Sequence, residues 1–265
     1  MYFASLNSGS NGNCYFVGNE HDAVVVDAGL SSRELLRRMQ ERQLDAQKIR
    51  AIFISHEHSD HIRGVDVLSR KLNVPVYITE ATHRSGRLAL SPALRRSFKH
   101  NEAVNISSLL VIPFRKAHDA AEPFSFTVHS NNKSVGVFTD IGHVCNELQH
   151  HFAQCHAAFL EANYDDEMLQ NGPYPYYLKK RISGPDGHLS NQQALELFIK
   201  HRAPHLSHLI LSHLSRENNH PDLVYQLFQP HAENTLIHVA SRNEASPVFD
   251  LSGKRHTSLQ THLSL

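Results

Sequence analysis

Short apolar runs alternate with amphipathic segments along this chain. Such runs predict buried strands at residues 23–27, 51–54, 74–78, 109–112, 124–129, 134–139, 157–160, 209–211 and 236–239. Ser31 with Glu34, and Ser190 with Gln193, have the spacing of capping boxes and predict the starts of two helices. Strands and helices alternate early and late, and the middle is rich in strands. We therefore expect two sheets packed between helices.

The length of the chain predicts a single domain over residues 1–265, because no linker, repeat or low-complexity stretch divides it. Its 26 basic and 26 acidic residues argue against a nucleic-acid coat protein, which needs a general cationic excess. The charge is nevertheless uneven. Residues 33–99 hold 14 Lys or Arg against 7 Asp or Glu, and residues 101–175 hold 3 against 9. Either solvated helix faces or a surface that faces a substrate would account for this asymmetry.

Three cysteines without framework spacing predict a reducing compartment rather than a disulfide scaffold. The first 30 residues lack the pattern of a signal peptide, and no apolar run reaches the length of a membrane span. We therefore expect a cytoplasmic protein without a membrane contact. The polar tail from Ser252 onward is expected to be mobile or to contact a partner.

The segment from His56 to His61 carries the clearest chemical signal, because it reads His-Glu-His-Ser-Asp-His directly after a predicted buried strand. Imidazole and carboxylate ligands suit zinc, manganese or iron. His56 and His58 would lie on one side of an extended segment, while Asp60 and His61 point elsewhere as a helix begins. One segment can thus supply ligands to two metal ions.

Further ligand candidates follow later strands. His118, Asp140 and His213 each stand where a predicted strand gives way to a loop, the usual place for a functional site on a layered fold. Gly142 lies just after Asp140 and would allow another segment to approach closely. Each residue alone is commonplace, but together with the first segment they form a set.

This ordered set resembles the metallo-β-lactamase superfamily. The resemblance implies a four-layer αββα sandwich with His56, His58 and His118 on one metal ion, Asp60, His61 and His213 on a second, and Asp140 bridging them. Cysteine in place of Asp140 would indicate the exported β-lactamases, and Glu in place of His58 the diiron flavoproteins. Only 72 residues separate Asp140 from His213, too few for a β-CASP insertion.

Two segments resemble motifs of RNase Z-like phosphodiesterases: one holds Glu161 after a strand, and the other holds His188 before a capped helix. The resemblance implies that this pair assists proton transfer. More specific stretches, including residues 5–14, 118–123, 139–144, 172–181 and 211–219, are similar to the YycJ/WalJ-like subfamily. That subfamily implies a metal-dependent exonuclease acting on DNA.

The expected mechanism is attack on phosphorus by a hydroxide that bridges two divalent metal ions, zinc or manganese with iron as an alternative. Asp60, Glu161 and His188 are the expected catalytic residues, and His188 would protonate the leaving oxygen. Asp27 and Asp119 would accept hydrogen bonds from ligand imidazoles, and His143 would face the substrate.

The substrate is the least determined part of the sequence interpretation. Tyr177, Lys179, Lys180 and Arg181 would stack on bases and hold phosphates, unless this proline-rich loop packs its tyrosines inward. Alternatives are an RNA phosphodiesterase, a hydrolase of small esters, thioesters or lactones, and a metal-stabilised binding module that is not an enzyme.

Overall fold

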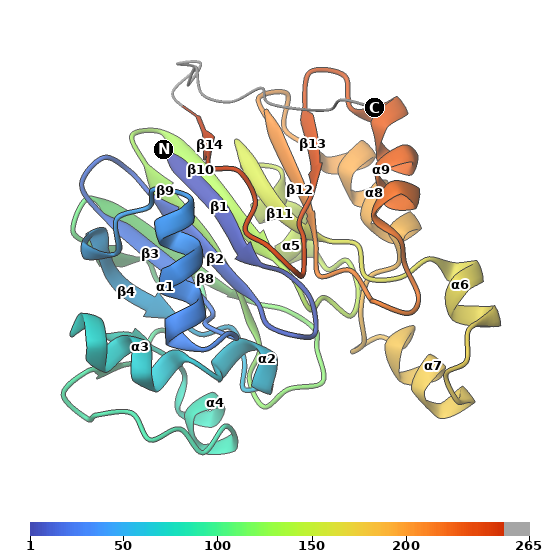
Figure 1. The fold of residues 1–265 in the computed structure, drawn as a ribbon. Coiled ribbons are helices and arrows are strands. Elements are labelled where there is room, and N and C mark those ends of the chain that lie inside the picture. Colours follow the sequence, from blue (N-terminus) through green and yellow to red (C-terminus); the bar gives the residue numbers. More distant parts are fainter. Residues whose placement is uncertain (252–265) are drawn as a thin grey trace.

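The computed structural model describes residues 1–251, so the expectation for the tail from Ser252 onward lies outside the described residues. Two seven-stranded mixed sheets face each other (Figure 1). The strands of the first sheet, in spatial order, are β14 (Phe249–Asp250), β1 (Tyr2–Asn7), β2 (Cys14–Gly18), β3 (Ala23–Val26), β4 (Ile49–Phe53), β5 (Val76–Tyr77) and β6 (Arg95–Arg96). Those of the second are β13 (Leu236–Val239), β12 (His208–Ser212), β11 (Ala157–Glu161), β10 (Lys133–Phe138), β9 (Phe124–Ser130), β8 (Leu109–Arg115) and β7 (Val104–Ile106).

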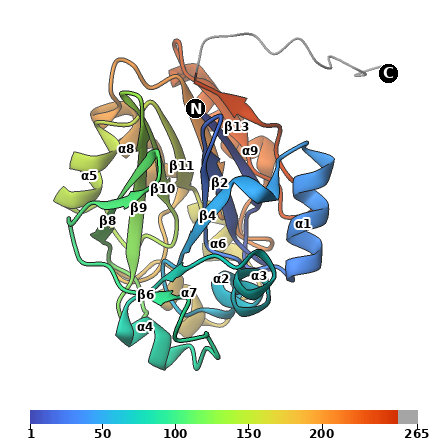
Figure 2. The same cartoon turned by 90° about the vertical axis from the view of Figure 1, so that its left-hand side faces the viewer.

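Helices cover the outer faces of both sheets. The α-helices are α1 (Ser32–Glu41), α2 (Ser59–Ile62), α3 (Val65–Leu72), α4 (Glu80–Ser85), α5 (Asn146–Phe152), α6 (Asp166–Asn171), α7 (Tyr176–Ile182), α8 (Asn191–His201) and α9 (Pro221–Phe228). Short 3₁₀ turns are η1 (Ala46–Lys48) and η2 (Gln229–His231). Helices α1 and α3 pack on the first sheet, and α5 and α9 pack on the second (Figure 2). The predicted αββα arrangement is confirmed.

Three apolar layers hold this arrangement together. The central layer lies between the sheets, where Phe3 meets Phe159 and Phe53 meets Phe126 with ring centroids 5.8 Å and 5.4 Å apart. The other two layers lie between each sheet and its helices. Burial of large side chains on both faces of a strand requires continuous apolar runs, which explains why inner strands such as β3, β10 and β11 were recognisable in the sequence.

Local sequence signals set several boundaries. Ser190 and Gln193 form the complete predicted capping box at the start of α8. At α1 only half of the predicted box forms: the Ser31 hydroxyl accepts from the Glu34 backbone N–H, while the Glu34 carboxylate pairs with Arg37 and Arg38. The helix therefore gains an ion pair to the exposed Arg37 and another to the buried Arg38 in place of a second cap bond.

Parallel pairing places the chemically important residues at one end of the molecule. Strands β3, β4, β5 and β6 run parallel in the first sheet, as do β10, β11, β12 and β13 in the second. The carboxyl ends of parallel strands lie at the same edge of a sheet, so the loops that follow them meet.

Candidate metal centre

The strand ends bring together every ligand candidate predicted from the sequence. His56 and His58 follow β4, Asp60 and His61 lie in α2, and His118, Asp140 and His213 follow β8, β10 and β12. Their nitrogen and oxygen atoms form groups in which all ligand atoms lie within 4.8 Å of one another. Segments far apart in the sequence thus converge on one cluster of metal-binding side chains.

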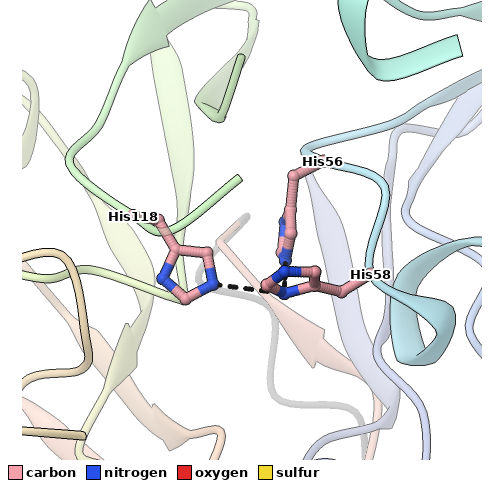
Figure 3. Close-up of side chains that lie close together, drawn as sticks. All are labelled: His56, His58 and His118. Carbon is pink, nitrogen blue, oxygen red and sulfur yellow. Dashed lines mark hydrogen bonds between the residues drawn. The ribbon is translucent and has the colours of Figure 1, made fainter. Parts of the chain in front are cut away.

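The first part of this cluster consists of three imidazole rings (Figure 3). His58 Nδ1 lies 3.1 Å from His56 Nε2 and 3.4 Å from His118 Nε2. His118 approaches from the opposite side to His56 and His58, so the three nitrogens point at a common centre (Figure 3). A tetrahedral or five-coordinate metal ion takes ligands in this convergent arrangement.

The second part is arranged around the carboxylate of Asp140. Its Oδ1 lies 3.3 Å from His213 Nε2 and 3.8 Å from His118 Nε2, and its Oδ2 lies 3.3 Å from His61 Nε2. Asp60 Oδ2 is 3.5 Å from His61 Nε2. The Asp140 side chain is 2% exposed, yet its Oδ2 accepts no hydrogen bond. A buried carboxylate oxygen without a hydrogen-bond partner is expensive, and a cation at this position would compensate it.

Hydrogen bonds to Nδ1 orient four of the imidazoles. Asp27 Oδ2 lies 2.7 Å from His61 Nδ1, and the Gly187 carbonyl lies 3.0 Å from His118 Nδ1. The Ser55 hydroxyl donates to Asp27 and lies 2.9 Å from His56 Nδ1. Acceptors on Nδ1 fix the tautomer and leave Nε2 to face the cluster. The geometry matches the role predicted for Asp27.

Asn13 orients the fourth imidazole, and the sequence interpretation gave it no role. Its Oδ1 lies 3.0 Å from His213 Nδ1 and accepts from the Gly9 N–H, while its Nδ2 lies 3.1 Å from both Asp60 Oδ2 and His61 Nε2. The side chain is completely buried. Asn13 thus contacts Asp60, His61 and His213 together. The signals available from the sequence were an asparagine in a Gly- and Ser-rich loop and the resemblance of residues 5–14 to the YycJ/WalJ-like subfamily.

The backbone at three of these positions is strained. Asp27, Asp140 and His213 have φ angles of 60°, 55° and 57°, in the left-handed region that side chains with a Cβ seldom adopt. Each residue stands just after a strand that carries it to the cluster. Strain of this kind costs on the order of 1–3 kcal/mol per residue and persists where the surroundings hold it in place.

Electrostatics within the cluster favour neutral imidazoles at His56 and His118 beside an ionised Asp140 carboxylate. At His61 burial disfavours the charged form, but the carboxylates of Asp140 and Asp27 outweigh it and raise the pKa well above its usual value. Burial lowers the pKa of His56 well below its usual value and lowers that of His118 to about 3. Burial alone would raise the pKa of Asp140, but His213 and His61 hold it well below its usual range. Neutral imidazole and ionised carboxylate are the protonation states that bind metals.

Glu161 and His188 lie next to the cluster. Glu161 is completely buried, accepts backbone bonds from Ile141 and Leu189, and lies 2.8 Å from His188 Nδ1 through its Oε1. Glu161 is therefore not a solvated residue at the end of its strand. Burial disfavours a charged His188, but the Glu161 carboxylate outweighs this effect and raises the pKa of His188.

The segment before His188 is tied to the same cluster. Gly142 packs so closely against this segment that a Cβ on residue 142 would lie 2.1 Å from the Pro185 carbonyl oxygen. This agrees with the close approach of another segment that we expected at Gly142. The Asp186 carbonyl accepts from the Asp119 N–H, and the Pro185 carbonyl lies 2.9 Å from His143 Nδ1. The loop that follows α7 is thereby held against the loops that carry His118 and Asp140.

Comparison with known proteins agrees with this geometry. A family model described as a beta-lactamase superfamily domain matches residues 22–213, which include every metal-binding side chain of the cluster but not Asn13. The chain belongs to the beta-lactamase superfamily. It is 32% identical to the exodeoxyribonuclease YycJ of Bacillus anthracis over 98% of both chains. It is also 32% identical to the exodeoxyribonuclease WalJ of Streptococcus pneumoniae, covering 86% of this chain and 88% of that one.

Solved structures agree on the fold of this beta-lactamase superfamily member. The metallo-beta-lactamase fold protein YhfI from Bacillus subtilis superimposes with a TM-score of 0.72 at 14% identity, covering 94% of this chain and 99% of that one. The superfamily implies divalent metal ions, and the donor set and the buried Asp140 Oδ2, which accepts no hydrogen bond, fit such ions. Fold and family together indicate a metal-dependent hydrolase.

The predicted substrate-binding residues lie on α7 of this superfamily member, which is a helix rather than a loop. Tyr177 is 74% exposed, which excludes the alternative in which it packs inward. Lys179 donates to the Gln170 carbonyl, and Lys180 lies 5.4 Å over the ring of Tyr176. The helix therefore presents aromatic and cationic side chains to solvent.

Arg181 connects α7 to the cluster. Its Nε donates to Asp119 Oδ2 at 2.5 Å, while Asp119 Oδ1 lies 4.0 Å from His58 Nε2, beyond hydrogen-bond range. Asp119 Oδ1 also lies 3.4 Å from His118 Nε2, while the Gly187 carbonyl lies 3.0 Å from the other ring nitrogen, His118 Nδ1. That Asp119 accepts from a ligand imidazole stays a prediction.

None of the helices in residues 1–251 combines the length and the apolar character of a membrane span. The three cysteines are free, with Cys14 and Cys155 buried.

Proposed function

We propose that this protein is a two-metal phosphodiesterase that degrades DNA as an exonuclease. The observation that carries the proposal is the buried Glu161 carboxylate bound to His188 within the same group of side chains as Asp140 and His213. The names of the two relatives support DNA as the substrate. Hydrolysis of a small ester at a metal centre has no need of the exposed aromatic and cationic helix beside it.

We assign the metal ligands by their position in the cluster. His56, His58 and His118 would hold one ion, Asp60, His61 and His213 the other, and Asp140 both. The ions are zinc or manganese, with iron as the alternative, because these metals accept mixed imidazole and carboxylate ligands. When bound, such ions polarise a phosphoryl group and make water a stronger nucleophile at neutral pH.

His188 is assigned as the proton donor to the leaving oxygen. Glu161 holds Nδ1, so Nε2 is the nitrogen free to deliver a proton. Glu161 is itself fixed by two backbone N–H groups and cannot turn away without leaving them unpaired in the interior. General acid catalysis of this kind contributes about 10²–10⁴-fold to rate.

Substrate binding is assigned to the exposed face of α7. Tyr177 would stack on a base, and Lys179, Lys180 and Arg181 would lie against backbone phosphates. Arg181 is already anchored to Asp119, so its guanidinium keeps a fixed position beside the metal centre. We also propose a single domain over residues 1–265 without a β-CASP insertion, and a cytoplasmic location without a membrane contact.

Degradation of an end-labelled DNA duplex in the presence of manganese tests the proposal. Asp60→Ala should lose bound metal and activity together, whereas His188→Ala should keep its metal and lose about 10²–10⁴-fold in kcat. Asp222→Ala and His205→Ala, at exposed positions outside the cluster, are the matched controls. Shortening from one end by the wild type would establish an exonuclease.

Three results would contradict the assignments. A His188→Ala enzyme with wild-type turnover would exclude the proton donor. A wild-type protein with two bound ions that leaves DNA intact would move the substrate to RNA or a small ester, and a single ion with a closed ligand shell would instead indicate a binding module.

A further inference from the structure

A second cationic surface lies beside the metal centre. It belongs to the first sheet, whereas α7 follows β11 of the second sheet. We define it as the α4 arm, residues 79–99, which comprise α4, the following loop and β6. Five Lys or Arg side chains stand in this arm against one acidic side chain, Glu80. The arm accounts for much of the cationic excess that the sequence showed between residues 33 and 99.

Four of these five cations are exposed, and two of them, Arg87 and Arg96, have no carboxylate partner among the described residues. The side chains of Arg84 and Lys99 are 78% and 77% exposed, and Arg87 and Arg96 are also exposed. Glu80 is shared between Arg84 and Arg95, and Lys99 lies 3.4 Å from Glu102 just outside the arm. Among residues 1–251, no carboxylate lies within ion-pair distance of Arg87 or Arg96, and the Arg96 guanidinium donates only to backbone carbonyls.

Direct contacts fix the arm to the metal-site loops. The Ser85 hydroxyl donates to Glu57, the residue between His56 and His58, over 3.1 Å. The same Glu57 oxygen accepts from the Ala121 N–H at 2.8 Å, three residues after His118. The Thr82 hydroxyl donates to the Glu122 carbonyl. The end of α4 is therefore held against the two loops that carry the three-histidine group.

Both cationic surfaces lie at the same end of the molecule. Helices α4 and α7 both project from the end where the site-bearing strands finish, in two views at right angles (Figures 1 and 2). Glu57 joins the arm to the loop of His56, and Arg181 joins α7 to Asp119 beside His118. The metal centre thus has a cationic surface anchored on each of its two sides.

We propose that the α4 arm binds the backbone phosphates of the nucleic-acid substrate, on the other side of the metal centre from α7. This inference rests on the proposed function and adds a second contact surface to it. Exposed guanidinium groups attract phosphates irrespective of base sequence, and each phosphate they neutralise releases counterions from DNA. Such contacts hold and orient a duplex without touching the reacting atoms.

The arm has one competing explanation. Strand β6 is the edge of its sheet, and exposed cations on an edge strand prevent pairing between molecules. That role would account for Arg96 but not for Arg84 and Arg87, which lie outside the strand.

The test compares the triple variant Arg84→Gln/Arg87→Gln/Arg96→Gln with the wild type. Binding of a labelled duplex with phosphorothioate ends, which resist digestion, is measured by fluorescence anisotropy at several salt concentrations. The triple variant should bind roughly tenfold more weakly, and the slope of log Kobs against log salt should fall by about 2–3. Its metal content and its hydrolysis of bis(p-nitrophenyl) phosphate should match the wild type, because the arm does not reach the reacting atoms.

The matched control is Arg37→Gln/Arg50→Gln/Lys200→Gln, which removes three exposed cations from α1, the start of β4 and the end of α8. Its salt slope should equal that of the wild type. If the wild type degrades DNA and the triple variant keeps the wild-type salt slope and affinity, phosphate binding by the α4 arm is overturned and the proposed function stands. A wild type that neither binds nor degrades the duplex would overturn the arm together with the proposed function.

Discussion

Replacing Asn13 by alanine should weaken metal binding at the Asp60, His61 and His213 side of the site, although Asn13 is not among the proposed ligands. The change removes the acceptor for His213 Nδ1 and the donor to Asp60 Oδ2. It leaves the His56, His58 and His118 group untouched. Loss of such an orienting residue typically lowers metal affinity by about 10–100-fold, or about 1.4–2.7 kcal/mol.

The same substitution should also destabilise the metal-free protein. Two buried donors, His213 Nδ1 and the Gly9 N–H, lose their acceptor in a region that is fully buried. An unsatisfied buried donor costs about 1–3 kcal/mol, so the expected loss is at least about 2 kcal/mol. Urea unfolding of the metal-free protein measures this part separately from metal affinity.

Competition with a chelator during titration measures the affinity for each ion. We expect one ion to bind as in the wild type and the other about 10–100-fold more weakly. Asn11→Ala is the matched control, because Asn11 lies in the same loop but is exposed and donates to the Arg242 carbonyl. A folded Asn13→Ala protein that binds both ions with wild-type affinity would refute the reasoning.

Three further predictions concern folding. Gly29→Ala would place a Cβ 1.6 Å from the Asp60 carbonyl oxygen. We therefore expect the free energy of unfolding in urea to fall by about 1–3 kcal/mol and metal binding to weaken. Wild-type stability and metal affinity in this variant would contradict the prediction. Burial lowers the pKa of His151 to about 4, below the ordinary value near 6.5, so the stability it contributes is present above about pH 6.5 and is lost as the pH falls through about 4. Over this pH range the free energy of unfolding of the metal-free wild type should fall by up to about 3 kcal/mol more than that of His151→Gln. Parallel plots of unfolding free energy against pH for the two proteins would exclude the effect. Ser190→Ala removes one half of a complete capping box, which should cost about 1 kcal/mol in thermal unfolding, and an unchanged melting temperature would show that the cap is dispensable.

The sequence predicted the layered fold because its central strands are buried on both faces. Such strands must be apolar where both faces are buried, as in β3 and in β4 from Ala51 to Phe53, and they read as continuous runs. Strands β1 and β2 were missed. β1 buries polar residues such as Ser5 and Asn7 beside its apolar ones, and these interrupt the pattern on which the prediction relied.

Helix α7 was missed for a different reason. None of its residues is buried, so it carries no apolar stripe, and the prolines before it are typical of a loop. Its position depends on Arg181 and on the following loop, which is tied to Gly142 and Asp119. These contacts join segments that lie more than 40 residues apart in the sequence, and local patterns carry no information about them.

The sequence by itself determined the chemical identity of the site. The order of His56, His58, Asp60 and His61 after a buried strand restricts the chemistry to a metal centre, because few other functions need imidazoles and a carboxylate at that spacing. Only the tertiary structure decided which atoms face the metals, which groups orient them and which surfaces flank them. The tautomers depend on Asp27, Asn13 and the Gly187 carbonyl, and these acceptors reach the site through parallel strand pairing and close loop packing. Hydrogen bonds act over about 3 Å, so they are set by the folded arrangement of distant segments and cannot be read from spacing along the chain.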